Sequence, residues 1–261
     1  MTQEEHFKNL VEYSAEQFVK AMVENKLVDD DKFGSGNAKF MISEFTKTIE
    51  IEDNPEIRRI LGVIPETGTL LINSAYFASW DKMKDTNNKD YSSKDFRLLQ
   101  KSLFHEFFHM LQTKGLGKAE SSALDEIAAS LAEQMTWTTY LKNVGENIPV
   151  GASVPVSYPE LVMHAERIFR NLGINKSDFI MSTTALDDGQ YTSINKKFKE
   201  HGLGYYTDFI KPLDEILFCM QMEQQEECQQ KQSELETRIS KAHAKLNTVN
   251  AALNAKHKDP N

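Results

Sequence analysis

The sequence predicts an α+β fold that is mostly helical, with a small sheet in its amino-terminal half and a long helix at its carboxyl end. Three observations indicate this class. Apolar residues recur at helical spacing along most of the chain, only two segments have the length and pattern of strands, and a heptad pattern follows Pro212. A chain of 261 residues, 40% of them hydrophobic, can bury a sizeable core.

The first predicted elements lie before residue 80. An apolar stripe over residues 3–25 predicts an amphipathic helix. The stretch 40–51 ends in TKTIEIE, whose partial alternation indicates a strand. The Asn-Pro pair at the start of 54–61 predicts a short helix there. The apolar segment 68–77, GTLLINSAYF, is predicted to be a buried strand.

Several further helices are predicted in the middle of the chain. Ser92 and Asp95 have the spacing of a capping pair for a helix that ends before Gly115. Ser122 and Asp125 open the next helix in the same way, and it extends to about residue 142. A helix that starts at Ser157-Tyr158-Pro159 then ends near Gly173, and helical patterns continue over 176–200.

The carboxyl-terminal segment has a pattern of its own. It contains neither glycine nor proline between Pro212 and Lys256, and its apolar residues repeat at spacings of four and three. We therefore predict that residues 1–211 form one domain and 212–261 a long helix. This helix either packs on its own domain, for example on the helix 3–25, or forms a coiled coil with a partner or a second copy. The residues of the heptad seam are Leu235, Ile239, Ala242, Leu246, Val249 and Leu253.

Charge and composition exclude some classes of partner. The formal net charge of −9 argues against binding to a nucleic-acid backbone, which needs a basic face. No apolar run reaches the length of a membrane span. The acidic amino terminus lacks the features of a signal peptide, so we expect a cytoplasmic protein, or one exported without a cleaved signal. Cys219 and Cys228 are too far apart along a helix to form a disulfide.

One short stretch, FHEFFHML at residues 104–111, carries the pattern of a metal site. His105 and His109 stand four apart, so a helix places both on one face with Cβ atoms about 5–6 Å apart. Glu106 is turned by about 100° from His105, beside a bound metal rather than on it. A carboxylate there can accept a proton from a zinc-bound water, whose pKa the metal lowers toward neutrality.

The alternative is an ordinary helix with two core histidines and a surface glutamate. Chance alone produces this pattern in about one or two such sequences per hundred, as for any short motif. The residues that flank the histidines carry no charge, so the helix is expected to be buried, and buried histidines need polar partners. A metal ion bound by both histidines would be such a partner.

The motif His-Glu-Phe-Phe-His resembles that of the zincin metallopeptidases. The metzincin branch would have a third histidine where this chain has Gly115. The gluzincin branch takes its third ligand from a glutamate on the next helix, and Glu126 matches that pattern in Asp-Glu-Ile-Ala-Ala. Glu133 is the rival, because it lies on the same helix face two turns later. Glu120, before the helix, is a weaker candidate.

The resemblance implies one Zn²⁺ per chain on His105, His109 and Glu126, with water in the fourth position and Glu106 as the general base. It also implies a downstream tyrosine or histidine that stabilises the oxyanion, for which we favour Tyr158 and His164. The further candidates for this role are Tyr140, Tyr191 and Tyr205.

Two other features of the family find no clear match. A thermolysin-like enzyme has an aspartate four residues after the glutamate ligand to orient the first histidine, but Ser130 stands there, so the partner of His105 is unassigned. Zincins also bind the substrate backbone along an edge strand before the motif helix. Segment 68–77 is the candidate for this role, and an ordinary core strand is the alternative.

The predicted function is that of a zinc-dependent endopeptidase with a specific protein substrate, similar to bacterial effector proteases that act inside another cell. The alternative is a coiled-coil interaction protein whose zincin-like metal site is structural or inactive.

Overall fold

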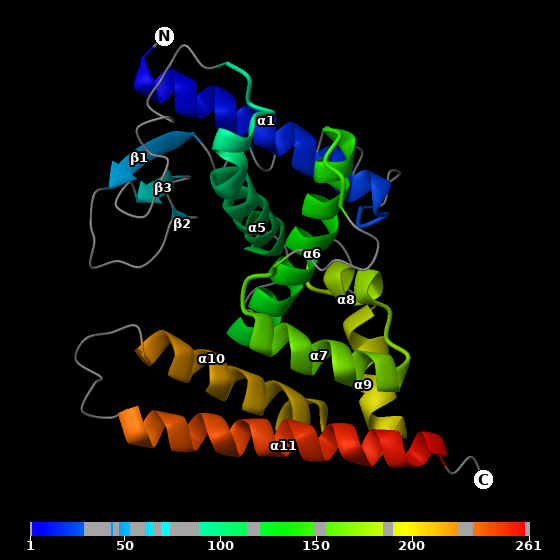
Figure 1. Ribbon diagram of the computed structural model, residues 1–261. Helices are drawn as coiled ribbons and strands as arrows, with labels where there is room; N and C mark the ends of the chain where they lie inside the picture. The colour runs from blue at the N-terminus through cyan, green and yellow to red at the C-terminus, as the bar shows by residue number, and fades with distance from the viewer. Residues whose placement is uncertain are drawn as a thin grey trace. The chain divides into compact units, whose positions relative to one another are not determined.

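The computed structural model confirms a mostly helical chain with one small sheet (Figure 1). It falls into two compact units, residues 1–115 with 132–154, and residues 116–131 with 155–261. The structure describes residues 2–28, 43, 47–52, 61–64, 69–73, 89–113, 121–148, 155–184, 190–223 and 232–258.

The first unit begins with helix α1, Gln3–Glu24, which confirms the helix predicted over 3–25. Its start is fixed by a capping box, in which the Thr2 hydroxyl accepts a hydrogen bond from the Glu5 backbone and the Glu5 carboxylate accepts one from the Thr2 backbone. Its apolar stripe is buried, and the helix packs against the motif helix α5.

The sheet of the first unit has three strands, β1 (Thr48–Glu52), β2 (Leu61–Ile64) and β3 (Thr69–Asn73), in the order β1-β3-β2. β1 is parallel to β3, and β2 is antiparallel to it. The predicted buried strand 68–77 is therefore confirmed over β3. Because β3 is hydrogen-bonded on both sides, the expectation that it is a free edge for substrate is wrong. The predicted helix over 54–61 lies outside the described residues, except that Leu61 begins β2.

Helix α5, Arg97–Thr113, carries the histidine motif and is preceded by the 3₁₀ turn η2, Lys94–Phe96. Ser93, not Ser92, occupies the cap position of this turn, without a capping hydrogen bond from its side chain, and the Ser92 hydroxyl donates to the side chain of Asp90. The predicted capping pair is thus wrong although the helix is present. α5 contacts α1 and strand β2. The following residues of α5 are fully buried: Leu99, Leu103, Phe104, Phe107, Phe108 and Leu111.

Helix α6, Ser122–Asn143, confirms the helix predicted over 122–142. Its first turn is capped one residue earlier than expected, since the Leu124 backbone donates to the Ser121 hydroxyl (3.2 Å). Asp214 adds a second acceptor there for the Ser121 hydroxyl (2.6 Å) and the Ala123 backbone (3.1 Å). At the other end of α6, the Trp137 ring meets Phe104 of α5 edge-on.

The second unit adds helices that follow the predicted patterns. α7 begins with Pro159 after Tyr158, whose φ of 49° is left-handed, and ends at Gly173 with a φ of 60°. This agrees with the predicted boundaries. The helices are α7 (Pro159–Leu172), α8 (Lys176–Ser182), α9 (Gln190–Glu200), the π-helical turn η3 (Tyr205–Ile210), α10 (Lys211–Glu223) and α11 (Gln232–Lys258).

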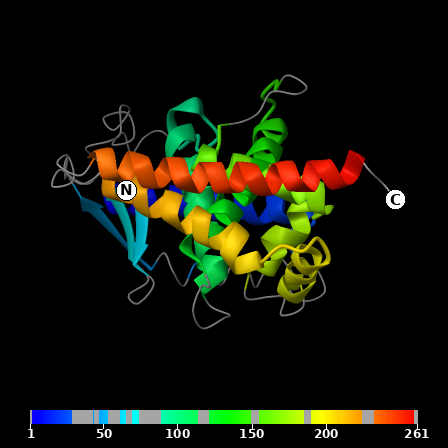
Figure 2. The same cartoon turned by 90° about the horizontal axis from the view of Figure 1, so that it is seen from below.

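The structure describes two helices, α10 and α11, in the segment 212–261 where the sequence predicts one long helix. Figure 2 shows α11 beside α10, and α11 also contacts α7. The heptad residues Leu235, Ala242, Leu246, Val249 and Leu253 are all buried. The seam is therefore part of the core of the second unit. No helix in the part of the chain that the structure describes is long and apolar enough to cross a membrane.

Candidate metal centre

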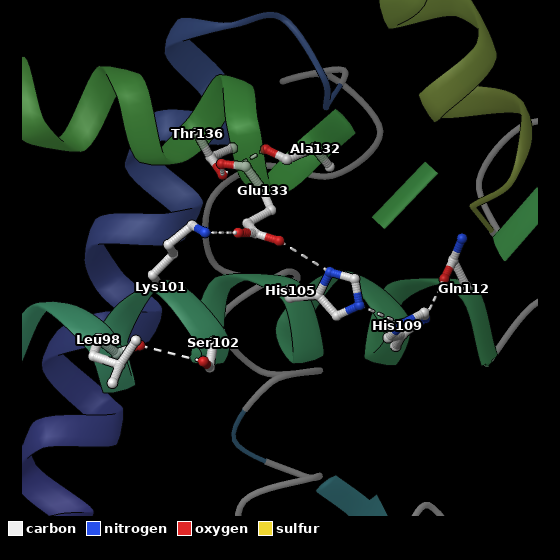
Figure 3. Close-up of polar contacts among 9 residues, drawn as sticks. All are labelled: Leu98, Lys101, Ser102, His105, His109, Gln112, Ala132, Glu133 and Thr136. Atoms are coloured by element: carbon white, nitrogen blue, oxygen red, sulfur yellow. Dashed lines mark hydrogen bonds and ion pairs between the residues drawn. The ribbon is translucent and has the colours of Figure 1, made fainter. Parts of the chain in front are cut away.

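Helix α5 places the two motif histidines on one face, as their spacing predicts. The Nε2 atoms of His105 and His109 lie 3.1 Å apart, and the two rings meet edge-on with centroids 4.7 Å apart (Figure 3). His105 is 8% exposed and His109 is partly exposed, so the pair lies at the margin of the core.

The outer nitrogen of His105 is held by a buried carboxylate. His105 Nδ1 lies 3.1 Å from Glu133 Oε2, and Glu133 is only 1% exposed. The other carboxylate oxygen of Glu133 forms an ion pair with Lys101 Nζ at 3.1 Å. Because an ionised carboxylate can only accept hydrogen bonds, this contact favours the His105 tautomer with its proton on Nδ1 and the lone pair of Nε2 toward His109.

The outer nitrogen of His109 has a partner of the same kind. His109 Nδ1 lies 2.8 Å from Gln112 Oε1, one turn later on α5. With the amide oxygen as acceptor, this contact favours the same tautomer for His109, with the proton on Nδ1 and the lone pair on Nε2.

The contact of 3.1 Å between the two Nε2 atoms is a hydrogen bond when one of them carries a proton, and two facing lone pairs that suit a shared cation when neither does. Two nitrogen ligands at about 2.0–2.1 Å from a tetrahedral zinc ion lie roughly 3.3 Å from each other. The spacing of the two Nε2 atoms therefore fits a zinc ion, and so does the tautomer that their contacts favour.

Glu126 of α6 supplies the third candidate ligand. One ligand atom each from His105, His109 and Glu126 lies within 4.8 Å of the other two. Two imidazoles and one carboxylate form the donor set of an open zinc site, which leaves one position for water or substrate. These are the three residues that the sequence predicts as ligands, and as a group they could hold a metal ion.

The other glutamates that the sequence analysis names do not belong to the described group of potential metal ligands. Glu106 is partly exposed, follows His105 on α5 and does not belong to the group of potential ligands, as expected for a residue turned by about 100° from the histidine face. Glu133, the rival third ligand, contacts the outer nitrogen of His105. Glu120 lies outside the described residues.

The two preferred oxyanion residues belong to the second unit. Tyr158 forms the cap of α7. His164 is 3% exposed, and its Nε2 lies 2.7 Å from His243 Nδ1 on α11. Burial, together with the nearby charges of His243 and Arg167, lowers the pKa of His164 to about 4. The oxyanion role of both residues stays a prediction.

Two of the other aromatic candidates, Tyr140 and Tyr205, are core residues. The Tyr140 hydroxyl donates to Gln100 Oε1 (3.2 Å), and burial raises its pKa. Tyr205 is buried against the rings of Phe198 and Phe209. The side chain of Tyr191 lies outside the described residues.

The sequence did not identify the partners of the two histidines. The sequence predicts Glu133 as a rival ligand rather than as a partner of His105, and Ser130, where a thermolysin-like enzyme has its aspartate, is buried in α6. Two signals were available: Lys101 stands one turn before His105, and Gln112 stands three residues after His109.

Comparison with protein-family models, with curated proteins and with solved structures gives no match. The class of the site therefore follows from its residues: it is a candidate metal centre with two histidines and one carboxylate.

Proposed function

We propose that this protein is a zinc-dependent endopeptidase that acts on a specific protein target. The observation that carries the proposal is the convergence of two imidazole nitrogens and one carboxylate, with a glutamate directly after the first histidine. His105, His109 and Glu126 would hold the ion. A zinc ion bound there would lower the pKa of a coordinated water and would polarise a substrate carbonyl.

Glu106 is the residue that moves protons in this proposal. Its carboxylate takes a proton from the attacking water and gives it to the amine that leaves when the peptide bond breaks. It is partly exposed on α5, so it can be reached by water. Proton transfer by a placed side chain contributes about 10²–10⁴-fold to a rate.

The test compares the wild type with Glu106→Gln, which keeps the size and shape of the side chain but cannot act as a base. Both proteins are analysed for zinc and then added to a cell lysate, in which new amino termini are identified by mass spectrometry. We expect about one zinc per chain in both proteins. New amino termini should appear with the wild type and be at least about 10²-fold fewer with the variant.

Two controls make the result specific. Glu146→Gln changes a partly exposed glutamate of the first unit and should leave cleavage unchanged. His109→Ala should lose both zinc and cleavage. If Glu106→Gln holds zinc and cleaves as the wild type does, the peptidase mechanism is wrong, and a structural metal site in an interaction protein is the better explanation.

A further inference from the structure

A chain of polar contacts around the buried carboxylate of Glu133 leads to the first histidine, and the proposed reaction does not use it. Figure 3 shows Lys101 and Glu133 in line with His105, on the side of the ring away from His109. We propose that Glu133 and Lys101 are positioning residues that set the tautomer and orientation of His105. This inference rests on the metal site proposed above and concerns how its first ligand is held.

Glu133 is placed for this role by the separate partners of its two oxygens. Oε1 pairs with Lys101 Nζ and Oε2 with His105 Nδ1, each at 3.1 Å. A carboxylate bound at both oxygens cannot rotate without losing a contact. Because Glu133 is 1% exposed, water does not readily replace a lost partner, and an unpaired carboxylate there would be costly.

Lys101 is placed by helix geometry. It precedes His105 by one turn of α5, so both side chains lie on the face that meets Glu133 of α6. Its side chain is 24% exposed, which lets the ammonium group stay near the surface while its charge balances the buried carboxylate. The two contacts of Glu133 therefore join α5 to α6 at the histidine.

The same geometry argues against Glu133 as a ligand. The lone pairs of Nδ1 and Nε2 leave an imidazole ring in divergent directions. Glu133 lies at Nδ1 of His105, whereas His109 lies at Nε2. An ion bound by both Nε2 atoms is thus on the opposite side of the ring from this carboxylate.

The experiment has two readouts, and neither is peptidase activity. In the metal-free protein, the nitrogen chemical shifts of the imidazole rings report which nitrogen of each histidine carries the proton. The dissociation constant for Zn²⁺ is then measured by competition with a chelator. The variants are Glu133→Gln, which keeps an acceptor oxygen without the charge, Glu133→Ala, which removes the acceptor, and Lys101→Met. Circular dichroism confirms that each variant is folded.

We expect the Nδ1–H tautomer for His105 in the wild type and a mixture of tautomers in Glu133→Ala. His109 serves as an internal reference, because Gln112 holds it independently and its tautomer should not change. Zinc affinity should fall about 10–100-fold in Glu133→Gln, the range found for partners of metal-bound histidines, and by a smaller factor in Lys101→Met. Lys94→Met, which removes a far more exposed lysine paired with Glu146, is the matched control.

Unchanged zinc affinity in Glu133→Gln, or an unchanged His105 tautomer in Glu133→Ala, would overturn the inference. A complete loss of zinc in Glu133→Gln, together with retention in Glu126→Gln, would also overturn it and make Glu133 the ligand. If the wild type binds no zinc at all, the proposed function fails. The tautomer of His105 in the metal-free protein then still decides whether Glu133 positions the ring.

Discussion

His164 on α7 and His243 on α11 share one hydrogen bond, with Nε2 and Nδ1 2.7 Å apart. Seven residues further along each helix, Asn171 donates to Asn250, also at 2.7 Å. Because the two contacts are separated by seven residues on each helix, α7 and α11 run parallel and stay in register over two turns. The histidine pair also makes this contact sensitive to acid, because only one proton fits between the two nitrogens.

The first prediction concerns pH and the stability of the second unit. The folded-state pKa of His164, about 4, is below its ordinary value of 6.5, so the unfolded state binds more protons between these values. The contribution of His164 to the free energy of unfolding is fully present above pH 6.5 and is lost as the pH falls toward 4. A shift of this size corresponds to roughly 3 kcal/mol.

Urea unfolding at pH 7, 5.5 and 4 measures this effect in the wild type and in His164→Gln, which keeps a hydrogen-bonding side chain but does not titrate. The loss of stability on acidification should be smaller in the variant. Equal pH dependence in the two proteins would contradict the prediction.

The second prediction concerns the heptad seam. Leu246 is fully buried in α11, so Leu246→Ala should lower the free energy of unfolding by about 2–5 kcal/mol. Glu236→Ala, at an exposed position of the same helix, should change it by less than about 0.5 kcal/mol. If Leu246→Ala leaves stability unchanged but alters the oligomeric state, the seam belongs to an interface between chains.

The third prediction concerns the start of α6. Asp214 accepts hydrogen bonds from the Ser121 hydroxyl and the Ala123 backbone, so Asp214→Ala removes an acceptor that caps this helix. We expect a loss of about 0.5–2 kcal/mol in unfolding free energy. Asp214→Asn keeps an oxygen in place and should recover part of that loss. Equal stability of both variants and the wild type would show that Ser121 alone is sufficient.

The fourth prediction concerns the third ligand. Glu126→Ala should weaken zinc binding by orders of magnitude while the histidine tautomers of the metal-free protein stay unchanged, because Glu133 and Gln112 hold both rings from behind. Competition with a chelator measures the affinity. Wild-type affinity in this variant would remove Glu126 from the site.

Helices were predictable wherever one apolar stripe had to be buried, as in α1, α5, α6, α7 and α11. Their exact starts were not, because two adjacent serines can each cap a helix: Ser93 and Ser121 take the cap positions where Ser92 and Ser122 were expected. The choice depends on tertiary partners, such as Asp214 for Ser121, which lie far away in the sequence.

The candidate site likewise has a part that the sequence predicts and a part that it does not. The spacing of His105 and His109 is local, so helix geometry alone brings them together. Whether Glu133 contacts His105 depends on how α6 is rotated about its own axis when it packs against α5. Residue spacing in the sequence does not predict that rotation. The heptad pattern likewise predicted a buried seam but not its partner, because α10 and α7 cover it with the same apolar contacts that a second chain would make.

The parallel pairing of α7 with α11 has a consequence for how the chain folds during synthesis. All residues of the first unit have been synthesised once residue 154 is made, whereas the second unit needs partners for α7 that lie 79 positions later. Until residues 232–258 have left the ribosome, the apolar stripe of α7 lacks its final cover. The second unit is therefore the part of the nascent chain on which chaperones would act longest.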